Sequence, residues 1–72
     1  MAREKIWSKK SNPDQATANK LGMKRYDLGT AIETIKGAAG LAGADAVDLY
    51  SNGDVVDQMN GEIIGNVHDE LL

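Results

Sequence analysis

Several residue types that build compact sites are absent from this chain of 72 residues or nearly so. There is no cysteine and only one histidine. A disulfide framework, a thiolate zinc site and a histidine-based metal site are therefore all excluded. No stretch approaches the roughly 20 apolar residues of a membrane span, and the opening MAREKIWSKKSNP lacks the apolar run of a signal peptide. We expect a soluble protein for which a cytosolic environment is allowed.

The short length limits the size of the core. A chain of 72 residues forms one domain at most, and its small core barely offsets the entropy of ordering the chain. We therefore expect a single domain of marginal stability. Its expected parts are a flexible segment over residues 1–12, a helical hairpin over residues 13–40 and a β-meander over residues 46–68.

Charge is divided unevenly between the two halves of the chain. The net charge is −3, yet all eight Lys and Arg lie in residues 1–36 together with four acids, whereas residues 37–72 hold seven acids and no Lys or Arg. Because local potential steers association, the first half could meet a polyanion and the second half a basic partner. The alternative is that the two halves neutralise each other in the fold.

Helix signals begin at residue 11. Ser11 or Asn12 can cap a helix of about residues 13–21, with Pro13 in its first turn, where a missing N–H costs nothing. Gly22 is expected to end this helix in a left-handed conformation. The residues 13–21 therefore predict a short first helix.

A second helix is predicted from Asp27, which we expect to cap it, to Gly37 or Gly40. Its apolar residues recur at helical spacing: Leu28, Ala31, Ile32 and Ile35. Together with the first helix, residues 17–36 have the spacing of a helix-turn-helix, for which an ordinary helical hairpin is the alternative.

Two Asn-Gly pairs divide the C-terminal third into strands. Asn52-Gly53 and Asn60-Gly61 favour two-residue type I′ hairpins, which set Leu49 opposite Val56 and Gln58 opposite Ile63. One face then gathers the expected core residues of the sheet: Val47, Leu49, Val56, Ile63 and Val67. The predicted fold class is α+β, with two N-terminal helices packed on a small three-stranded antiparallel β-meander.

Metal and phosphate sites fit this pattern poorly. A calcium loop starting at Asp48 would need an oxygen ligand at Tyr50 and a bidentate Glu at Met59. Each Gly lies between strands, whereas a phosphate-cradling loop leads from a strand into a helix. Asp48 and Asp57 fall opposite each other in the predicted register, which leaves a weak divalent site as one interpretation of that pair. We predict no metal and no cofactor.

His68 is the only side chain that titrates near neutral pH without help, so general acid or base chemistry is expected to need it. The cations Lys20, Lys24 and Arg25 are candidates to bind nucleic acid. Cutting RNA through its own 2′-hydroxyl needs a proton shuttle and cations near the phosphate. This hypothesis requires that the imidazole and the cations share one surface. The alternative is a surface histidine at a strand end.

The segment LGTAIETIKGAAGLAGADAVDLYSNGDVVDQMNGEIIGNVHDEL, residues 28–71, resembles the C-terminal toxin domains of bacterial polymorphic toxins, the Rhs and contact-dependent inhibition effectors. Matching positions include Leu28, Gly29, Lys36, Gly53-Asp54-Val55 and Ile64-Gly65-Asn66. The resemblance implies a domain secreted within a larger effector, acting in the cytoplasm of a target cell and neutralised by a cognate immunity protein. Many such domains are predicted ribonucleases, and several resemble barnase and colicin ribonucleases in placing helices before an antiparallel sheet.

The resemblance also implies a site. Members of the family often carry a histidine at the position of Glu33, and Lys36 follows in both. Glu33 is then the candidate base, as a carboxylate is in barnase-like enzymes, and His68 the candidate acid of a metal-independent ribonuclease. Lys36 is the third candidate catalytic residue, for charge stabilisation at the scissile phosphate. The same substitution could instead mean that the chain is inactive.

A non-catalytic module is the alternative function. The chain would then be either a helix-turn-helix-like DNA-binding protein or an acidic inhibitor of a basic partner. Carboxylates such as Glu33 on the second helix would be repelled by DNA phosphates, which weighs against sequence-specific DNA recognition.

Overall fold

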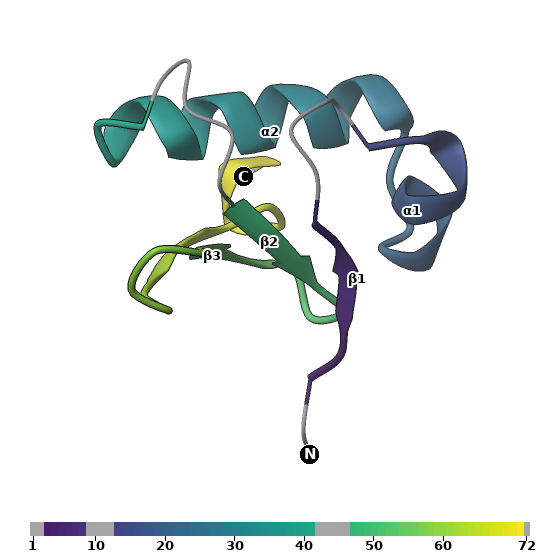
Figure 1. Cartoon of the computed structure of the whole chain (residues 1–72). Coiled ribbons are helices and arrows are strands. Elements are labelled where there is room, and N and C mark those ends of the chain that lie inside the picture. The colour runs from purple at the N-terminus through teal and green to yellow at the C-terminus, as the bar shows by residue number, and fades with distance from the viewer. Residues whose placement is uncertain (1–2, 9–12, 42–46, 72) are drawn as a thin grey trace.

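The chain has an α+β fold in which a four-stranded antiparallel sheet carries a long helix on one face (Figure 1). The computed structural model describes residues 3–8, 13–41 and 47–71. In chain order the elements are β1 (Lys5–Trp7), α1 (Gln15–Lys20), α2 (Arg25–Ala38), β2 (Val47–Tyr50), β3 (Asp54–Asp57), β4 (Ile63–Asn66) and a 3-10 helix, η1 (Asp69–Leu71). The predicted fold class is confirmed, with one strand more than expected. None of the described helices has the length and apolar character that crossing a membrane requires.

The additional strand is β1, which lies within the segment that the sequence predicted to be flexible. Lys5 pairs with Tyr50 and Trp7 with Leu49, with a bulge between the two pairs. The backbone N–H of Ser51 also donates to the Glu4 carbonyl. Three residues are too few to show the alternation that reveals a strand. The sheet order is β1-β2-β3-β4, so β1 and β4 are its edges.

Helix α1 begins later than predicted. Its N-cap is Asp14, whose carboxylate accepts from the Thr17 backbone N–H at 2.9 Å, the usual role of a short acidic side chain at this position. The predicted caps Ser11 and Asn12 lie outside the described residues. Gly22 follows the helix with φ of 67°, as expected for a left-handed position.

Helix α2 buries the face that its sequence predicted. Leu28, Ala31, Ile32 and Ile35 are all buried. The prediction that Asp27 caps the helix was wrong: the N-cap is Lys24, without a side-chain hydrogen bond, and Asp27 lies in the first turn. An acid there still interacts favourably with the helix dipole.

The first hairpin is offset by one residue from the predicted register. Leu49 pairs with Val55 and Asp48 with Val56, so the expected pairing of Leu49 with Val56 was wrong. A type I′ turn needs positive φ at Asn52, but among the described residues only glycines have positive φ, and Gly53 has 93°. The Gly53 N–H donates to the Tyr50 carbonyl at 2.9 Å. The loop therefore has three residues and ends in a left-handed glycine.

The second hairpin also departs from the predicted two-residue turn. Val56 pairs with Ile63, and a bulge lies beside Val55. The sequence predicted Gln58 opposite Ile63, so that pairing was wrong. Asp57 accepts from the Gly61 N–H at 2.8 Å through its backbone carbonyl, and its own N–H donates to the Glu62 carbonyl. Four residues, 58–61, thus lie between the hydrogen-bonded residues Asp57 and Glu62.

The shift in register exchanges the faces of β3, because successive side chains of a strand point to opposite sides. Val55 is fully buried in the core, while Ile63 is 53% exposed. The predicted core positions Val47, Leu49 and Val67 are confirmed. Val56 is buried but lies outside the main cluster.

The predicted pairing of Asp48 with Asp57 was also wrong, since Asp48 lies opposite Val56 and Asp57 opposite Val47. Within the part of the chain that the structure describes, no group of three or more His, Cys, Asp or Glu residues could hold a metal ion. The weak divalent site considered for this pair therefore loses its basis.

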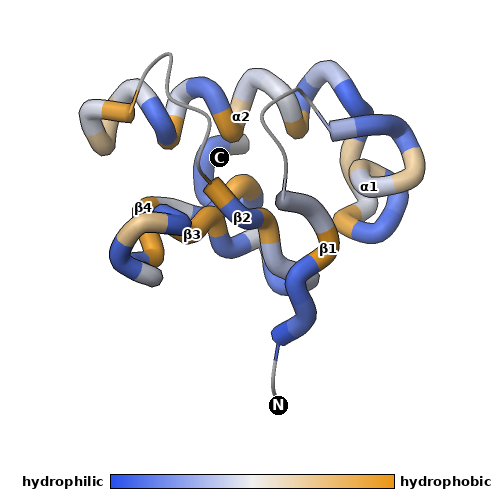
Figure 2. Tube along the Cα trace, viewed as in Figure 1, coloured by the Kyte–Doolittle hydropathy of each residue, from blue (hydrophilic) through white to orange (hydrophobic). Residues whose placement is uncertain are grey.

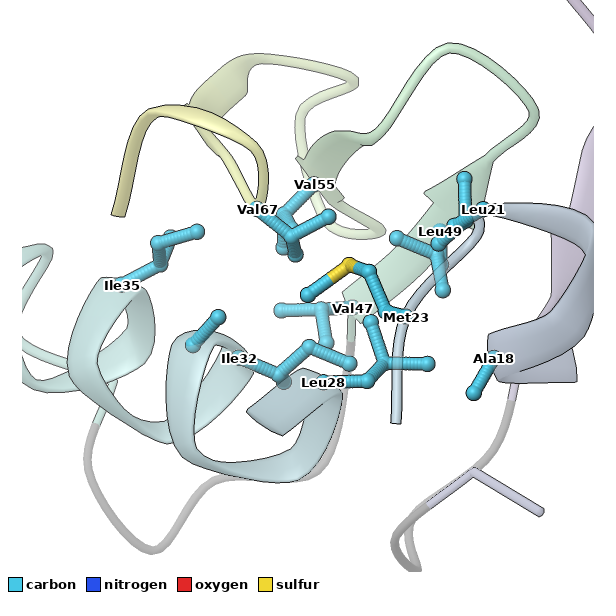
Figure 3. Packing of buried hydrophobic residues seen from close by; sticks show 11 residues of the cluster. Ala18, Leu21, Met23, Leu28, Ile32, Ile35, Val47, Leu49, Val55 and Val67 are labelled. Carbon is cyan, nitrogen blue, oxygen red and sulfur yellow. The ribbon is translucent and has the colours of Figure 1, made fainter. Parts of the chain in front are cut away.

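The core lies between α2 and the sheet. Figure 2 shows the hydrophobic positions of α2 on the side of the helix that faces the strands. In Figure 3, Leu28, Ile32 and Ile35 of α2 point toward Val47, Leu49 and Val55 of the sheet and toward Val67, which directly follows β4. At Gly65 a Cβ atom would lie 2.8 Å from Ile35 Cγ2. This close approach of β4 to α2 leaves room only for glycine.

Candidate functional site

A groove of about 620 Å³ runs over α2 on a side away from the core. The described residues that line it are Arg25, Tyr26, Gly29, Thr30, Glu33 and Thr34. They occupy two adjacent rows of the helix, because residues three and four apart share a face. The eight steps from Arg25 to Glu33 correspond to about 12 Å along the helix axis. The groove therefore has a cation at one end and a carboxylate at the other.

Glycine at position 29 forms the floor of this groove. Gly29 is buried within α2 and carries no side chain that could fill the space between the rows. Tyr26 on its N-terminal side is 74% exposed. The lining thus combines a cation, an aromatic ring, hydroxyl groups and a carboxylate.

Glu33 and Lys36, two of the predicted catalytic residues, form an ion pair. The distance between Lys36 Nζ and Glu33 Oε1 is 3.7 Å, and the two side chains are 6% and 56% exposed respectively. A lysine buried to this degree needs an opposite charge near it. Glu33 supplies that charge while keeping more than half of its surface open. Lys36 is therefore placed to hold the Glu33 carboxylate, and burial keeps it from contacting a substrate directly.

The three predicted nucleic-acid-binding residues lie at the connection between the helices. Lys20 ends α1, Lys24 is the N-cap of α2 and Arg25 is its first residue, and all three are exposed. Gln15 holds the two helices together, because its side-chain oxygen accepts from the Arg25 N–H at 3.2 Å. Of the three cations, Arg25 lines the groove with Glu33.

His68 lies at another place in the fold, directly after β4. Its ring covers Gly53 in the loop between β2 and β3, where a Cβ atom would lie 2.7 Å from His68 Cδ2. Its backbone N–H donates to Asn66 Oδ1 at 2.9 Å. His68 is exposed, and no described hydrogen bond or ion pair joins its ring to Glu33 or Lys36. The structure thus pairs two members of the predicted catalytic set, while the described contacts of the third are with Gly53 and Asn66.

A second polar cluster surrounds Asp54 beside His68, and we call it the Asp54 network. Its carboxylate accepts from Arg3 at 2.7 Å, Asn66 at 2.9 Å and Asn52 at 3.1 Å. Burial raises the pKa of Asp54, but the hydrogen bonds from Asn66 and Asn52 and the Arg3 cation outweigh this and hold the pKa below its ordinary value.

Two ion pairs connect the basic start of the chain to the acidic sheet. Besides Arg3 with Asp54, Lys5 Nζ lies 3.7 Å from Asp48 Oδ2. Gln58 also donates to Asp48 at 2.8 Å. Burial raises the pKa of Asp48, but the Ser8 and Gln58 side chains and the Lys5 cation lower it more. The halves therefore neutralise each other in part, while the cations of the helical connection stay exposed.

Sequence reasoning missed two features of this surface. Tyr26 and Thr30 line the groove, and their spacing from Arg25 and Glu33 on one helix was a usable signal. Arg3 and Asp54 are 51 positions apart, and nothing in the local sequence indicates that they meet.

Comparison with known proteins found no family model, curated protein or solved structure that matches this chain. The resemblance of residues 28–71 to polymorphic toxin domains stays a prediction.

Proposed function

We propose that this chain is an RNA-cleaving toxin domain with its reaction site in the groove on α2. One observation carries the proposal: Arg25 and Glu33 line the same groove, with Lys36 beside the carboxylate. A guanidinium can bind a phosphate through two parallel hydrogen bonds, and an exposed carboxylate can accept a proton. These are two of the groups that RNA cleavage through the 2′-hydroxyl requires.

Each groove residue has a distinct role in the proposed reaction. Glu33 accepts the proton of the ribose 2′-hydroxyl, whose oxygen then attacks the neighbouring phosphorus. Arg25 stabilises the negative charge that builds on the phosphate oxygens. The departing 5′-oxygen takes a proton from water. Lys36 keeps the Glu33 carboxylate in place, so the reaction needs no metal and no cofactor.

A cognate immunity protein is the partner that this proposal implies. Residues 37–72 contain no Lys or Arg, and the exposed acids of the β3–β4 loop and η1 include Glu62, Asp69 and Glu70. Met59 in the same loop is 86% exposed and offers an apolar contact. A basic partner surface would complement this region. Delivery within a larger secreted effector, with action in the cytoplasm of a target cell, is part of the same proposal.

Nucleic-acid binding without cleavage is the second candidate. It is favoured by the exposure of Lys20, Lys24 and Arg25 at one helix connection. Such a module would retain duplex DNA with a steep dependence on salt. The acidic-inhibitor alternative is weakened, because Asp48 and Asp54 already pair with Lys5 and Arg3.

The test is an RNA cleavage assay in the presence of a chelator. We expect the purified chain to degrade RNA, and Glu33→Gln to lower the rate by about 10² to 10⁴-fold, because the substitution removes the base. The thermal melt of Glu33→Gln should stay cooperative but fall modestly, because the buried Lys36 ammonium loses its anionic partner and keeps only an amide oxygen beside it. Glu62→Gln, which changes an exposed acid outside the groove, serves as the matched control.

Two outcomes would overturn the proposal. One is intact RNA and normal growth of cells that express the chain at a good level. The other is cleavage by Glu33→Gln at the rate of the unchanged chain. A substrate with a 2′-deoxy sugar at the cleavage position should resist the active chain, because it has no attacking oxygen.

A further inference from the structure

Tyr26 is an exposed aromatic residue that the reaction described above leaves unused. Large hydrophobic residues exposed in the described part of the chain are Tyr26, Met59 and Ile63. A single exposed aromatic is ordinary on a protein surface. Tyr26 differs from the other two because it lines the groove, between Arg25 and Thr30. A ligand that binds in the groove would therefore contact Tyr26.

The groove is an open surface feature, and its described lining comes from α2 alone. Its size therefore does not select a ligand, and the ligands that could bind there differ in whether they present a free base face. Within a duplex the flat faces of the bases are covered by their stacked neighbours, and the edges in the deep major groove are out of reach of side chains.

The chemistry of the lining matches an unpaired nucleotide. A tyrosine ring offers a flat face on which a base can stack, and the guanidinium of Arg25 can hold the adjoining phosphate. Tyr26 and Arg25 are adjacent residues in the first turn of α2, and both line the groove. Glu33 lies about two turns further along the same lining.

We propose that Tyr26 makes the site selective for single-stranded RNA by stacking on an unpaired base next to the cleaved phosphate. This inference rests on the proposed function, since it assigns a substrate class to the same groove. Arg25 binds the phosphate and Tyr26 supplies the preference for unpaired bases. Duplex RNA carries more charge per length but offers no base face.

Binding can be measured by fluorescence anisotropy with the Glu33→Gln chain, so that cleavage does not remove the probe. The probes are a labelled oligoadenylate and its duplex with oligouridylate. We expect the single strand to bind more tightly than the duplex. Binding by charge alone would give the opposite order, because the duplex has the higher charge density.

Substitutions of Tyr26 isolate the stacking contribution. Tyr26→Ala should weaken single-strand binding about tenfold or more and leave duplex binding unchanged. Tyr26→Phe should retain the preference, because the ring remains. Met59→Ala removes a similarly exposed residue from the β3–β4 loop and should alter neither affinity. Equal weakening for both probes, or none, on Tyr26→Ala would overturn the inference.

The two proposals can fail separately. If the unchanged chain cleaves RNA but Tyr26→Ala keeps its single-strand preference, the stacking role is wrong and the ribonuclease stands. If the chain binds single strands through Tyr26 but never cleaves them, the reaction is wrong and the binding site stands. Thermal melts of the Tyr26 and Met59 variants that match the melt of the Glu33→Gln chain show that the fold is intact.

Discussion

The carboxylates Glu33 and Asp54 each lie beside a cation, yet their surroundings differ. Asp54 accepts hydrogen bonds from three side chains, and its own side chain is 15% exposed. Glu33 has an ammonium at 3.7 Å and keeps most of its surface open to the groove. The first carboxylate has its hydrogen-bonding capacity occupied by the fold, while the second has capacity left for a ligand.

This contrast teaches how to separate structural from functional charge in a small chain. An ion pair alone does not distinguish them, since both carboxylates have one. The two carboxylates are distinguished by the number of hydrogen-bond donors around each oxygen and by how exposed each site is. Loss of Asp54 should therefore affect the free energy of unfolding, and loss of Glu33 the rate of RNA cleavage, which is the largest effect we expect.

Removal of Asp54 should give the next largest effect. Asp54→Ala leaves Arg3, Asn52 and Asn66 without their shared acceptor, and we expect it to lower the free energy of unfolding by about 1–3 kcal/mol. Urea denaturation measures this. Glu70→Ala, which changes an exposed acid in η1, should stay within about 0.5 kcal/mol. Equal effects of the two substitutions would erase the contrast with Glu33.

Acid should act on the same network. The pKa of Asp54 is below its ordinary value of 3.8, so its contribution to stability is present above that value and is lost as the pH falls through the lower pKa of the folded state. The free energy of unfolding should therefore decrease below about pH 4. Asp54→Asn should flatten this decrease. An identical pH dependence in the variant and the unchanged chain would contradict the assignment.

His68 should give the smallest effect of the set. Because its ring lies over Gly53 and not among the described residues of the groove, we expect His68→Ala to lower the RNA cleavage rate by less than about tenfold. Proton transfer by a positioned side chain typically contributes about 10² to 10⁴-fold. A loss in that range with an unchanged melt would show that the imidazole reaches the substrate, and would restore it as the acid.

The helical part of the fold could be predicted from sequence because its signals are local. The spacing of Leu28, Ile32 and Ile35 places them on one face whatever else the chain does. Gly22 follows α1 in a left-handed conformation that glycine adopts without any distant contact, so this position could be predicted from the residue type. Capping was less certain, because Asp14 competes with neighbouring polar residues for the same role.

The sheet was predicted in kind but not in register. Both Asn-Gly pairs lie in hairpin loops, yet Asn52 does not have the positive φ that a type I′ turn demands. Loop length depends on which register buries Val55 and Val67 against α2, and that is decided by packing across the molecule. Strand β1 depends on pairing with a strand more than 40 positions away, about which three residues carry no information.

The candidate site also has a part that local sequence predicts and a part that depends on distant contacts. Arg25, Glu33 and Lys36 lie on one helix, so their common side follows from their spacing. The position of His68 depends on β4 and on the β2–β3 loop, and no local pattern predicts it. The Asp54 network likewise joins the two ends of the chain.

The contact between His68 and Gly53 gives the molecule a built-in spectroscopic reporter. An aromatic ring this close to a methylene group shifts the magnetic resonance of its protons. The Gly53 α-proton signals should therefore report the position of the imidazole ring without any label or substitution. Movement of the ring when RNA is added would be visible in the same two resonances.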